Sequence, residues 1–374
     1  MASGRVLARP IVAPRSLPSF DQAAMDGYAV NSAGLTSRSS ALPVVGRTDA
    51  GDRPGTLEPG TAQRIMTGAA LPAGADAVVM QECVTSLDGS IQFHGPVSAD
   101  MHVRRTGEDI VEGRTVLGAG RTIRWPETAL LAALGVSVVP VVPLLHVAIL
   151  TTGSELRRPG QALAGGDIFD SNGPMLGALL AMPSVDMTLS TSDDDIDAIA
   201  SALQKFAETS SMVVTAAGMA CGDRDYVRTA IDRLGGRLDV AGVAMKPGKP
   251  LALGRLGGTC FVGLPGNPQA AAFAALAFVR PMIDCLLGIS TPGRLTAALA
   301  SSHATKLGRT ELLPVHLNAE AGRLVASHCG QAGSHRLRPL VDADAVAVIT
   351  GAGETTRAET MVEVLPFDRS GFQR

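Results

Sequence analysis

The sequence predicts a multidomain α/β protein with a β-rich, two-lobed N-terminal half, a central α/β domain built on a mainly parallel sheet, and a small C-terminal β-barrel. The length of 374 residues argues for several domains. Short apolar runs separated by glycine and proline turns fill both ends of the chain, whereas the middle alternates such runs with helix-length segments. We expect the domains to span 1–145, 146–288 and 289–374.

The N-terminal half carries turn signals at short intervals, such as Pro54-Gly55. Apolar pairs between them, such as Ile65-Met66, predict short strands. A helix is predicted over 126–134, because Pro126 suits a first helical turn and Gly135 suits a helix end.

The central segment alternates predicted strands with predicted helices, as in a parallel sheet covered on both faces. Asn172 is expected to cap the first helix, and Pro281 to end the last. Right-handed crossovers would bring the loops after three of the strands to one sheet edge. The predicted strands are 146–150, 212–215, 251–253 and 261–264, and the predicted helices are 172–182, 195–206, 226–234 and 269–279.

The last segment returns to short β runs, which are typical of a small barrel. The predicted strands are 312–317, 324–327, 345–349 and 361–365.

The composition excludes several classes of function. A net charge of −3 gives no global attraction to nucleic acid or to an anionic membrane. Five well-separated cysteines without a CxxC pair indicate reduced thiols. The longest apolar stretch, 136–150, contains two prolines and His146 and is too short to span a membrane. No secretory signal is evident, so we expect a cytoplasmic protein.

Polar loops follow the predicted central strands. Glu155 would project at the carboxyl edge of the sheet, although a solvated loop glutamate is an alternative. Gly218 and Gly222 flank a turn whose backbone N–H groups can form an anion cradle. Asp223 and Asp225 precede a helix; one of them can cap it, which leaves the other free to bind magnesium.

Two lysines, Lys246 and Lys249, stand on a turn stiffened by prolines, which suits a grip on phosphate. A surface turn with solvated lysines is the alternative. The Pro265–Pro268 turn lets the backbone approach a ligand and opens a helix. These turns indicate an enzyme that handles a phosphorylated small molecule with metal assistance.

Other polar residues are ambiguous by themselves. Asp26, Thr67 and Asp109 are small or acidic residues on predicted loops. The seven histidines show no metal-binding spacing, and we expect all of them to be structural or on the surface.

Eight motifs, in order along nearly the whole chain, resemble the molybdopterin molybdenumtransferase family, which includes MoeA and the gephyrin E-domain. GQAGSH at 330–335 extends this resemblance. The eight motifs are PSFDQAAMDGYAV at 18–30, RIMTGAALPAGADAVVMQE at 64–82, RRTGEDI at 104–110, TTGSEL at 151–156, FDSN at 169–172, GDRDYV at 222–227, MKPGKPLALGRL at 245–256 and GLPGNP at 263–268.

The resemblance implies a transferase of molybdenum cofactor biosynthesis. Such an enzyme inserts molybdenum from molybdate into adenylylated molybdopterin and releases AMP, with Mg²⁺. It also implies a homodimer with the site between the α/β domain of one subunit and the N-terminal lobe of the other. The implied catalytic residues are Asp26, Thr67, Asp109, Glu155, Asp225, Lys246 and Lys249. The implied substrate-binding residues are Ser171, Asn172, Asp194, Gly218, Gly222, Pro265, Gly266, Asn267 and Pro268, and the implied metal ligands are Glu155 and Asp225.

Some positions depart from the family pattern. The run 216–220 (AAGMA) replaces Ser-Gly-Gly-Val-Ser, Ser154 replaces an aspartate, and Ala24 and Gln269-Ala270 stand where serines are usual. Each lost hydrogen bond to a charged group costs roughly 1.5–3 kcal/mol. These changes suggest an alternative, a degenerate paralogue that binds molybdopterin or a partner protein without catalysis. A hydrolase related through the molybdopterin-binding-type domain is a third hypothesis, but it does not explain the N-terminal motifs.

Overall fold

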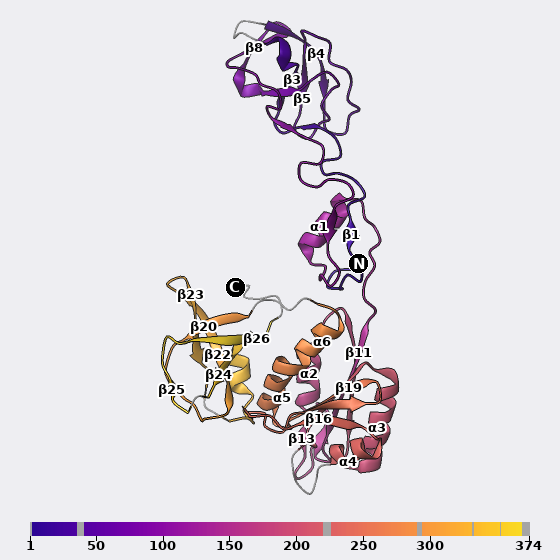
Figure 1. Ribbon diagram of the computed structural model, residues 1–374, viewed down its shortest axis with the longest axis vertical. Helices are drawn as coiled ribbons and strands as arrows, with labels where there is room; N and C mark the ends of the chain where they lie inside the picture. Colours follow the sequence, from indigo (N-terminus) through magenta and orange to yellow (C-terminus); the bar gives the residue numbers. More distant parts are fainter. Residues whose placement is uncertain are drawn as a thin grey trace. The chain divides into compact units, whose positions relative to one another are not determined.

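The computed structural model describes residues 2–35, 41–219, 226–289, 294–330, 333–351 and 353–368 (Figure 1). The chain divides into two compact units. The N-terminal unit contains residues 1–3 and 7–141, and the C-terminal unit contains residues 4–6 and 142–374.

The N-terminal unit contains a six-stranded sheet and a separate two-stranded pair, β2–β9. Gly27 begins β3 where the Val79 carbonyl approaches so closely that any Cβ would collide with it, which explains the glycine. The strands are, in sheet order, β6 (Ala77–Met80), β3 (Gly27–Val30), β5 (Ala62–Ile65), β4 (Ala41–Thr48), β8 (Ser90–Phe93) and β7 (Val84–Leu87), and the pair is β2 (Gln22–Ala23) with β9 (Val103–Arg104).

A second cluster in this unit surrounds α1 (Trp125–Ala133) and the strand pair β1 (Ile11–Val12) and β10 (Thr115–Leu117). Leu7 and Leu131 are among the buried side chains of its own apolar core. The unit thus has separate cores around its sheet and around α1. The helix predicted over 126–134 and the two-lobed, β-rich architecture are both confirmed.

The C-terminal unit contains a second six-stranded sheet, whose first four strands are parallel. The last two, β18 and β16, run antiparallel to their neighbours, so the prediction of a mainly parallel sheet is confirmed with an antiparallel edge. The strands are, in sheet order, β14 (Val185–Ser192), β11 (Leu145–Thr152), β15 (Met212–Ala216), β19 (Thr259–Leu264), β18 (Ala252–Leu256) and β16 (Arg237–Ala241).

Helices cover both faces of this sheet, because successive strand residues point to opposite faces and apolar residues lie on both. Val147 and Val214 share one core with α2 (Asn172–Leu180), α5 (Pro268–Ala274) and α6 (Arg280–Leu286). Ala148 and Val213 share the opposite core with α3 (Ile196–Thr209) and α4 (Tyr226–Arg233). The side chain of Asp195 caps α3 by accepting a bond of 2.8 Å from the Ala198 N–H.

Two helix-end predictions are wrong. Asn172 does not cap α2. The Asp170 carboxylate accepts the Gly173 N–H at 3.0 Å instead, and the Asn172 side chain donates to Gly266 O. Pro281 does not end the last helix, because a π-helical turn over Ala275–Val279 precedes it and the chain stays helical to Leu286. Such a turn changes the hydrogen-bond ladder where proline would otherwise break it.

The continuous helical stretch Pro268–Leu286 has the length and apolar composition of a membrane span, but 56% of its apolar window is buried inside the protein. Phe273, Val279 and Ile283 lie in the core beneath the sheet. We therefore interpret the stretch as a core helix.

The last part of the chain forms the predicted barrel. The strands β22, β23, β20, β26 and β24 pair in that order, and β24 pairs back with β22 to close it. The short strand β17 joins β22 in parallel from the α/β domain. The bounds are β17 (Met245–Lys246), β20 (Leu295–Leu299), β22 (Thr310–Glu320), β23 (Arg323–His328), β24 (Ala345–Thr350) and β26 (Met361–Pro366); α7 spans Arg338–Asp342, and small pairs are formed by β12 (Leu156–Arg157) with β13 (Ile168–Phe169) and by β21 (His303–Ala304) with β25 (Thr355–Thr356).

Candidate active site

The loops after the parallel strands meet at one edge of the α/β sheet, as predicted. Backbone bonds join them directly: the Gly153 N–H donates to Ser192 O at 3.1 Å, and the Ala217 N–H donates to Leu264 O at 3.2 Å. The polar residues that follow four different strands therefore share one surface.

Glu155 lies exposed on the loop after β11. Its carboxylate oxygens lie 2.8 and 2.9 Å from where a Cβ on Gly153 would stand, so a side chain at position 153 would push this carboxylate aside. The neighbouring Ser154 hydroxyl accepts the Asp194 N–H at 3.0 Å and ties this loop to the loop after β14. The other predicted metal ligand, Asp225, lies outside the described residues, as does Gly222.

The predicted anion cradle and the Pro265–Pro268 turn touch each other. Ala217 and Gly218 both have left-handed φ angles, of 81° and 73°. A Cβ on Gly218 would collide with Val227, and a Cβ on Gly266 would stand 3.2 Å from that of Ala217. Gly218 therefore leaves room for Val227 of α4, whereas Gly266 lets the second turn approach Ala217 without crowding.

Asn172 connects α2 to the same turn. Its Nδ2 donates to Gly266 O at 2.7 Å, while its Oδ1 is buried without a hydrogen-bond partner among the described residues. Ser171 precedes it as the residue before the first helical turn. Sequence reasoning missed Asp170, which is buried and accepts the Thr151 hydroxyl at 2.8 Å, so that it fixes α2 to β11.

A cavity of about 830 Å³ opens beside this turn, between the α/β sheet and the barrel. Lys246 and Lys249 line it from the proline-rich turn, and both are exposed. Pro265, Gly266 and Asn267 also line it, and Pro268 follows as the first residue of α5. The structure thus places the two lysines and the Pro265–Asn267 turn around one space.

The barrel supplies residues to this cavity that sequence reasoning missed. The Asn267 Nδ2 donates to the Ser334 hydroxyl at 2.9 Å, and Gln269 N–H donates to Ser334 O at 3.1 Å. The GQAGSH motif was the only signal for this contact. Two histidines line the cavity, a position that the sequence did not predict. The barrel residues in its wall include His303, Arg309, Glu311, His328 and Ser334.

Glu311 is a buried carboxylate in this wall. Its burial acts to raise its pKa, but hydrogen bonds from Arg309 and His303 and the charge of Lys246 outweigh burial and hold the pKa below its ordinary value. The carboxylate is therefore ionised at neutral pH.

In the N-terminal unit, Asp26 and Thr67 form a direct pair. Asp26 Oδ1 accepts the Thr67 hydroxyl at 2.7 Å and the Thr67 N–H at 2.8 Å. The Thr67 hydroxyl, followed by its N–H, lowers the pKa of Asp26, so the carboxylate remains charged below its ordinary range.

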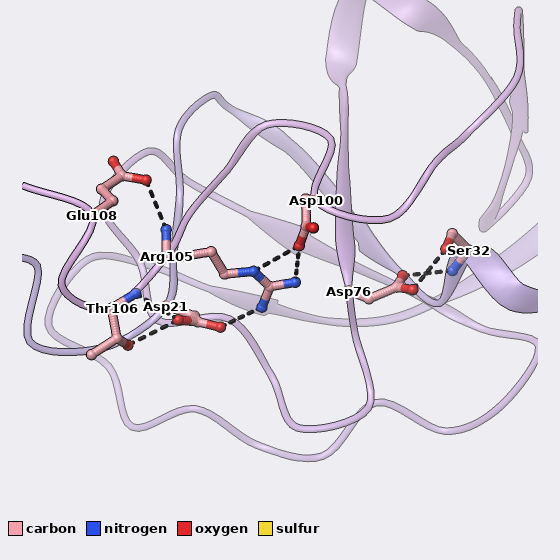
Figure 2. A network of polar contacts seen from close by, with 7 residues as sticks. All are labelled: Asp21, Ser32, Asp76, Asp100, Arg105, Thr106 and Glu108. Carbon is pink, nitrogen blue, oxygen red and sulfur yellow. Dashed lines mark hydrogen bonds and ion pairs between the residues drawn. The ribbon is translucent and has the colours of Figure 1, made fainter.

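Asp109 lies exposed on the loop after β9. A network around Asp21 holds this loop to the segment that leads to Asp26 (Figure 2). Asp21 Oδ1 accepts the Thr106 N–H and hydroxyl, both at 2.8 Å, and its other oxygen pairs with Arg105. The Arg105 Nε also donates to Asp100 at 2.7 Å. The network positions the loops that carry Asp26 and Asp109.

Metal ligands do not form a preformed cage in the described part of the chain, where no group of three or more His, Cys, Asp or Glu side chains is arranged to hold an ion. An ion that uses one or two carboxylates together with substrate phosphates needs no such cage.

Comparisons with known proteins agree along the whole chain. Family models match residues 1–135 (MoeA N-terminal region, domains I and II), 148–284 ("Probable molybdopterin binding domain") and 296–367 (MoeA C-terminal region, domain IV). Molybdopterin molybdenumtransferase 2 of Mycobacterium tuberculosis is 35% identical over 97% of this chain and 92% of its own length. The chain belongs to the molybdopterin molybdenumtransferase family.

Other members of this family agree in sequence and fold. The molybdopterin molybdenumtransferase of Haemophilus influenzae is 33% identical over 98% of this chain and 92% of its own length. The crystal structure of a molybdopterin biosynthesis MoeA protein from Pyrococcus horikoshii OT3 superposes with a TM-score of 0.83, with 28% identity, over 97% of this chain and 92% of that one. The multidomain α/β fold and the family predicted from the motifs are thereby confirmed.

Proposed function

We propose that this protein inserts molybdenum from molybdate into adenylylated molybdopterin and releases AMP. The observation that carries the proposal is the cavity of about 830 Å³ that brings Lys246, Lys249 and Arg309 together beside the Pro265–Pro268 turn. Its volume is within the range of small-molecule sites, and its cations suit an anionic substrate.

The lysines and Arg309 neutralise the charge of molybdate and of the substrate phosphates. Cations at the wall of a partly enclosed site act more strongly than they would in bulk water, because fewer water molecules screen them. Lys246 and Lys249 are both exposed at the cavity and so are accessible to an anion. The Asn172 side chain holds the Pro265–Pro268 turn at the cavity through its bond to Gly266 O.

Glu155 fits a magnesium ion that is shared with substrate phosphate, because it offers exposed, hard carboxylate oxygens. Asp225 would be the second ligand. When bound, the ion would neutralise phosphate charge during cleavage of the phosphoanhydride.

Asp26, Thr67 and Asp109 would act in a site formed between two subunits of a homodimer. The support for this role is the direct pairing of Asp26 with Thr67, which joins two of the family-like motifs at one place. We also propose that the enzyme works in the cytoplasm. The domain boundaries at 145 and 288 remain predictions.

The binding-only paralogue is the second candidate, favoured by Ala217 and its neighbours in the cradle. The full-length relatives named as transferases favour the active enzyme. The third hypothesis, a hydrolase, does not account for the family matches at 1–135 and 296–367.

The deciding experiment is AMP release from adenylylated molybdopterin by the purified protein with Mg²⁺, with and without molybdate. Molybdate-dependent release is expected. Tight binding of molybdopterin without release would replace the proposal by the binding-only paralogue.

A further inference from the structure

The wall of the cationic cavity contains a buried negative charge. Glu311, on β22, is only 5% exposed and lines the same cavity as Lys246 and Lys249. A carboxylate repels an anionic ligand, and a buried charge is costly unless it is paired. Its presence therefore requires an explanation other than direct contact with the anion.

The contacts of Glu311 suggest that explanation. Oε1 accepts from the Arg309 Nη2 at 2.9 Å, and Oε2 lies 3.2 Å from the His303 Nε2. On the neighbouring strand β17, Lys246 is in register with Glu311. The carboxylate thus contacts Arg309, which directly precedes β22, and His303 on β21, and it stands in register with Lys246 on β17.

Long cationic side chains lose rotamer freedom when they bind a ligand, which weakens binding. A partner that fixes them before binding removes part of this cost. The backbone pairing of β17 with β22, extended by the Thr310 N–H, which donates to Ala244 O at 2.9 Å, fixes the lysine turn in the same way.

We propose that Glu311 is a positioning residue that holds Arg309 and His303 on the cavity wall in the arrangement that binds a tetrahedral oxyanion. The inference deepens the function proposed above and rests on it for the identity of the anion. The anion is either free molybdate or the phosphate of the nucleotide-bearing substrate.

An electrostatic role and a positioning role of Glu311 predict opposite effects of Glu311→Gln on oxyanion binding. This substitution removes a negative charge from an anion cavity, so electrostatics alone predicts tighter binding of oxyanions. Positioning predicts weaker binding, because a neutral amide holds Arg309 and His303 less firmly than a carboxylate does. Whether the affinity for oxyanions rises or falls therefore distinguishes the two roles of Glu311.

The test is calorimetric titration of the purified full-length protein with sodium molybdate and, separately, with inorganic phosphate. The dissociation constant for the bound anion is expected to rise about tenfold in Glu311→Gln, as loss of charge-assisted hydrogen bonds implies, and to recover in part in Glu311→Asp. An effect confined to molybdate or to phosphate identifies which anion the wall holds. Unchanged or tighter binding in Glu311→Gln overturns the proposal.

The matched control is Glu363→Gln, which removes a barrel carboxylate paired with Arg294 at 3.0 Å, outside the cavity. It should bind both anions like the wild type. A folding defect would reduce the number of binding sites while leaving the dissociation constant unchanged, so it is not mistaken for a positioning effect. Wild-type protein that binds anions but releases no AMP contradicts the proposed function alone, whereas wild-type protein that binds neither anion overturns the role of Glu311.

Discussion

The Asp26 carboxylate accepts two hydrogen bonds from Thr67, through the hydroxyl at 2.7 Å and the backbone N–H at 2.8 Å, although the residues are 41 positions apart. Gly68, which follows with a φ of 82°, turns the chain directly after Thr67. This pairing joins two motifs that look unrelated in the sequence. It also identifies the group that lowers the pKa of Asp26 most.

Thr67→Ala should shift the acid limb of the pH–rate profile for AMP release to higher pH. The Thr67 hydroxyl is the largest influence that lowers the pKa of Asp26, so its loss lets the carboxylate take up a proton at higher pH than in the wild type. Thr67→Ser keeps a hydroxyl and should retain the wild-type profile. Identical profiles for the alanine and serine variants would show that this bond does not control Asp26 during turnover.

Asn172→Ala should raise the KM for adenylylated molybdopterin. The substitution removes the 2.7 Å bond to Gly266 O and the unpartnered Oδ1, both at the turn beside the cavity. Loss of one hydrogen bond is worth about 0.5–1.5 kcal/mol, or roughly two- to tenfold in KM. Asn318→Ala, at an exposed position on β22, is the control. A normal KM in steady-state assays of Asn172→Ala would exclude a binding role for this side chain.

Glu127→Gln should destabilise the N-terminal unit, and more so at neutral than at acidic pH. Burial acts to raise the pKa of Glu127, but bonds from Arg124 and Arg121 outweigh it and lower the pKa from 4.5 to about 2. A carboxylate whose pKa is lower in the folded than in the unfolded state stabilises the folded state when the pH is above the unfolded-state pKa. For Glu127 this contribution is about 3 kcal/mol at most. This stability is lost as the pH falls from about 4.5 through about 2.

Denaturant unfolding of both proteins at pH 7, 4 and 3 measures this effect. The difference in unfolding free energy between the wild type and Glu127→Gln should shrink as the pH falls. A difference that stays constant over this range would mean that the Glu127 charge contributes nothing.

Ala217→Gly should stabilise the C-terminal unit by about 1 kcal/mol. Ala217 has a φ of 81°, a left-handed conformation that strains every residue with a Cβ, and the relief exceeds the entropy that glycine adds to the unfolded chain. Ala216→Gly, one residue earlier in β15, has no such strain to relieve and should destabilise. Thermal unfolding distinguishes the two, and a lower melting temperature for Ala217→Gly would contradict this account.

Local patterns predicted most elements of the fold. Amphipathic spacing predicted α3, and apolar runs predicted β15 and β19. The errors arose where tertiary context overrides local signals. Pro281 looks like a helix stop, but the preceding π-helical turn carries the helix past it. The edge strand β14 was missed although Val185, Met187 and Leu189 alternate with polar residues, a pattern typical of a half-exposed strand.

The candidate site was predicted only in part. Lys246 and Lys249 stand in a proline-rich turn motif and the Pro265–Pro268 turn follows β19, so these residues were recognisable from the sequence. Arg309 and His303 were not, because they enter the cavity from the barrel, and no spacing in a linear sequence shows that β17 pairs with β22.

The most direct test of the central claim is to measure kcat/KM for molybdate-dependent AMP release in Lys249→Ala beside Lys205→Ala. Lys249 lines the cavity, whereas Lys205 lies exposed on α3 at the opposite face of the sheet. Loss of a charged contact to the anion predicts a decrease of roughly 10- to 100-fold for Lys249→Ala and wild-type turnover for Lys205→Ala. Wild-type kcat/KM in Lys249→Ala would contradict the assignment of this cavity as the active site.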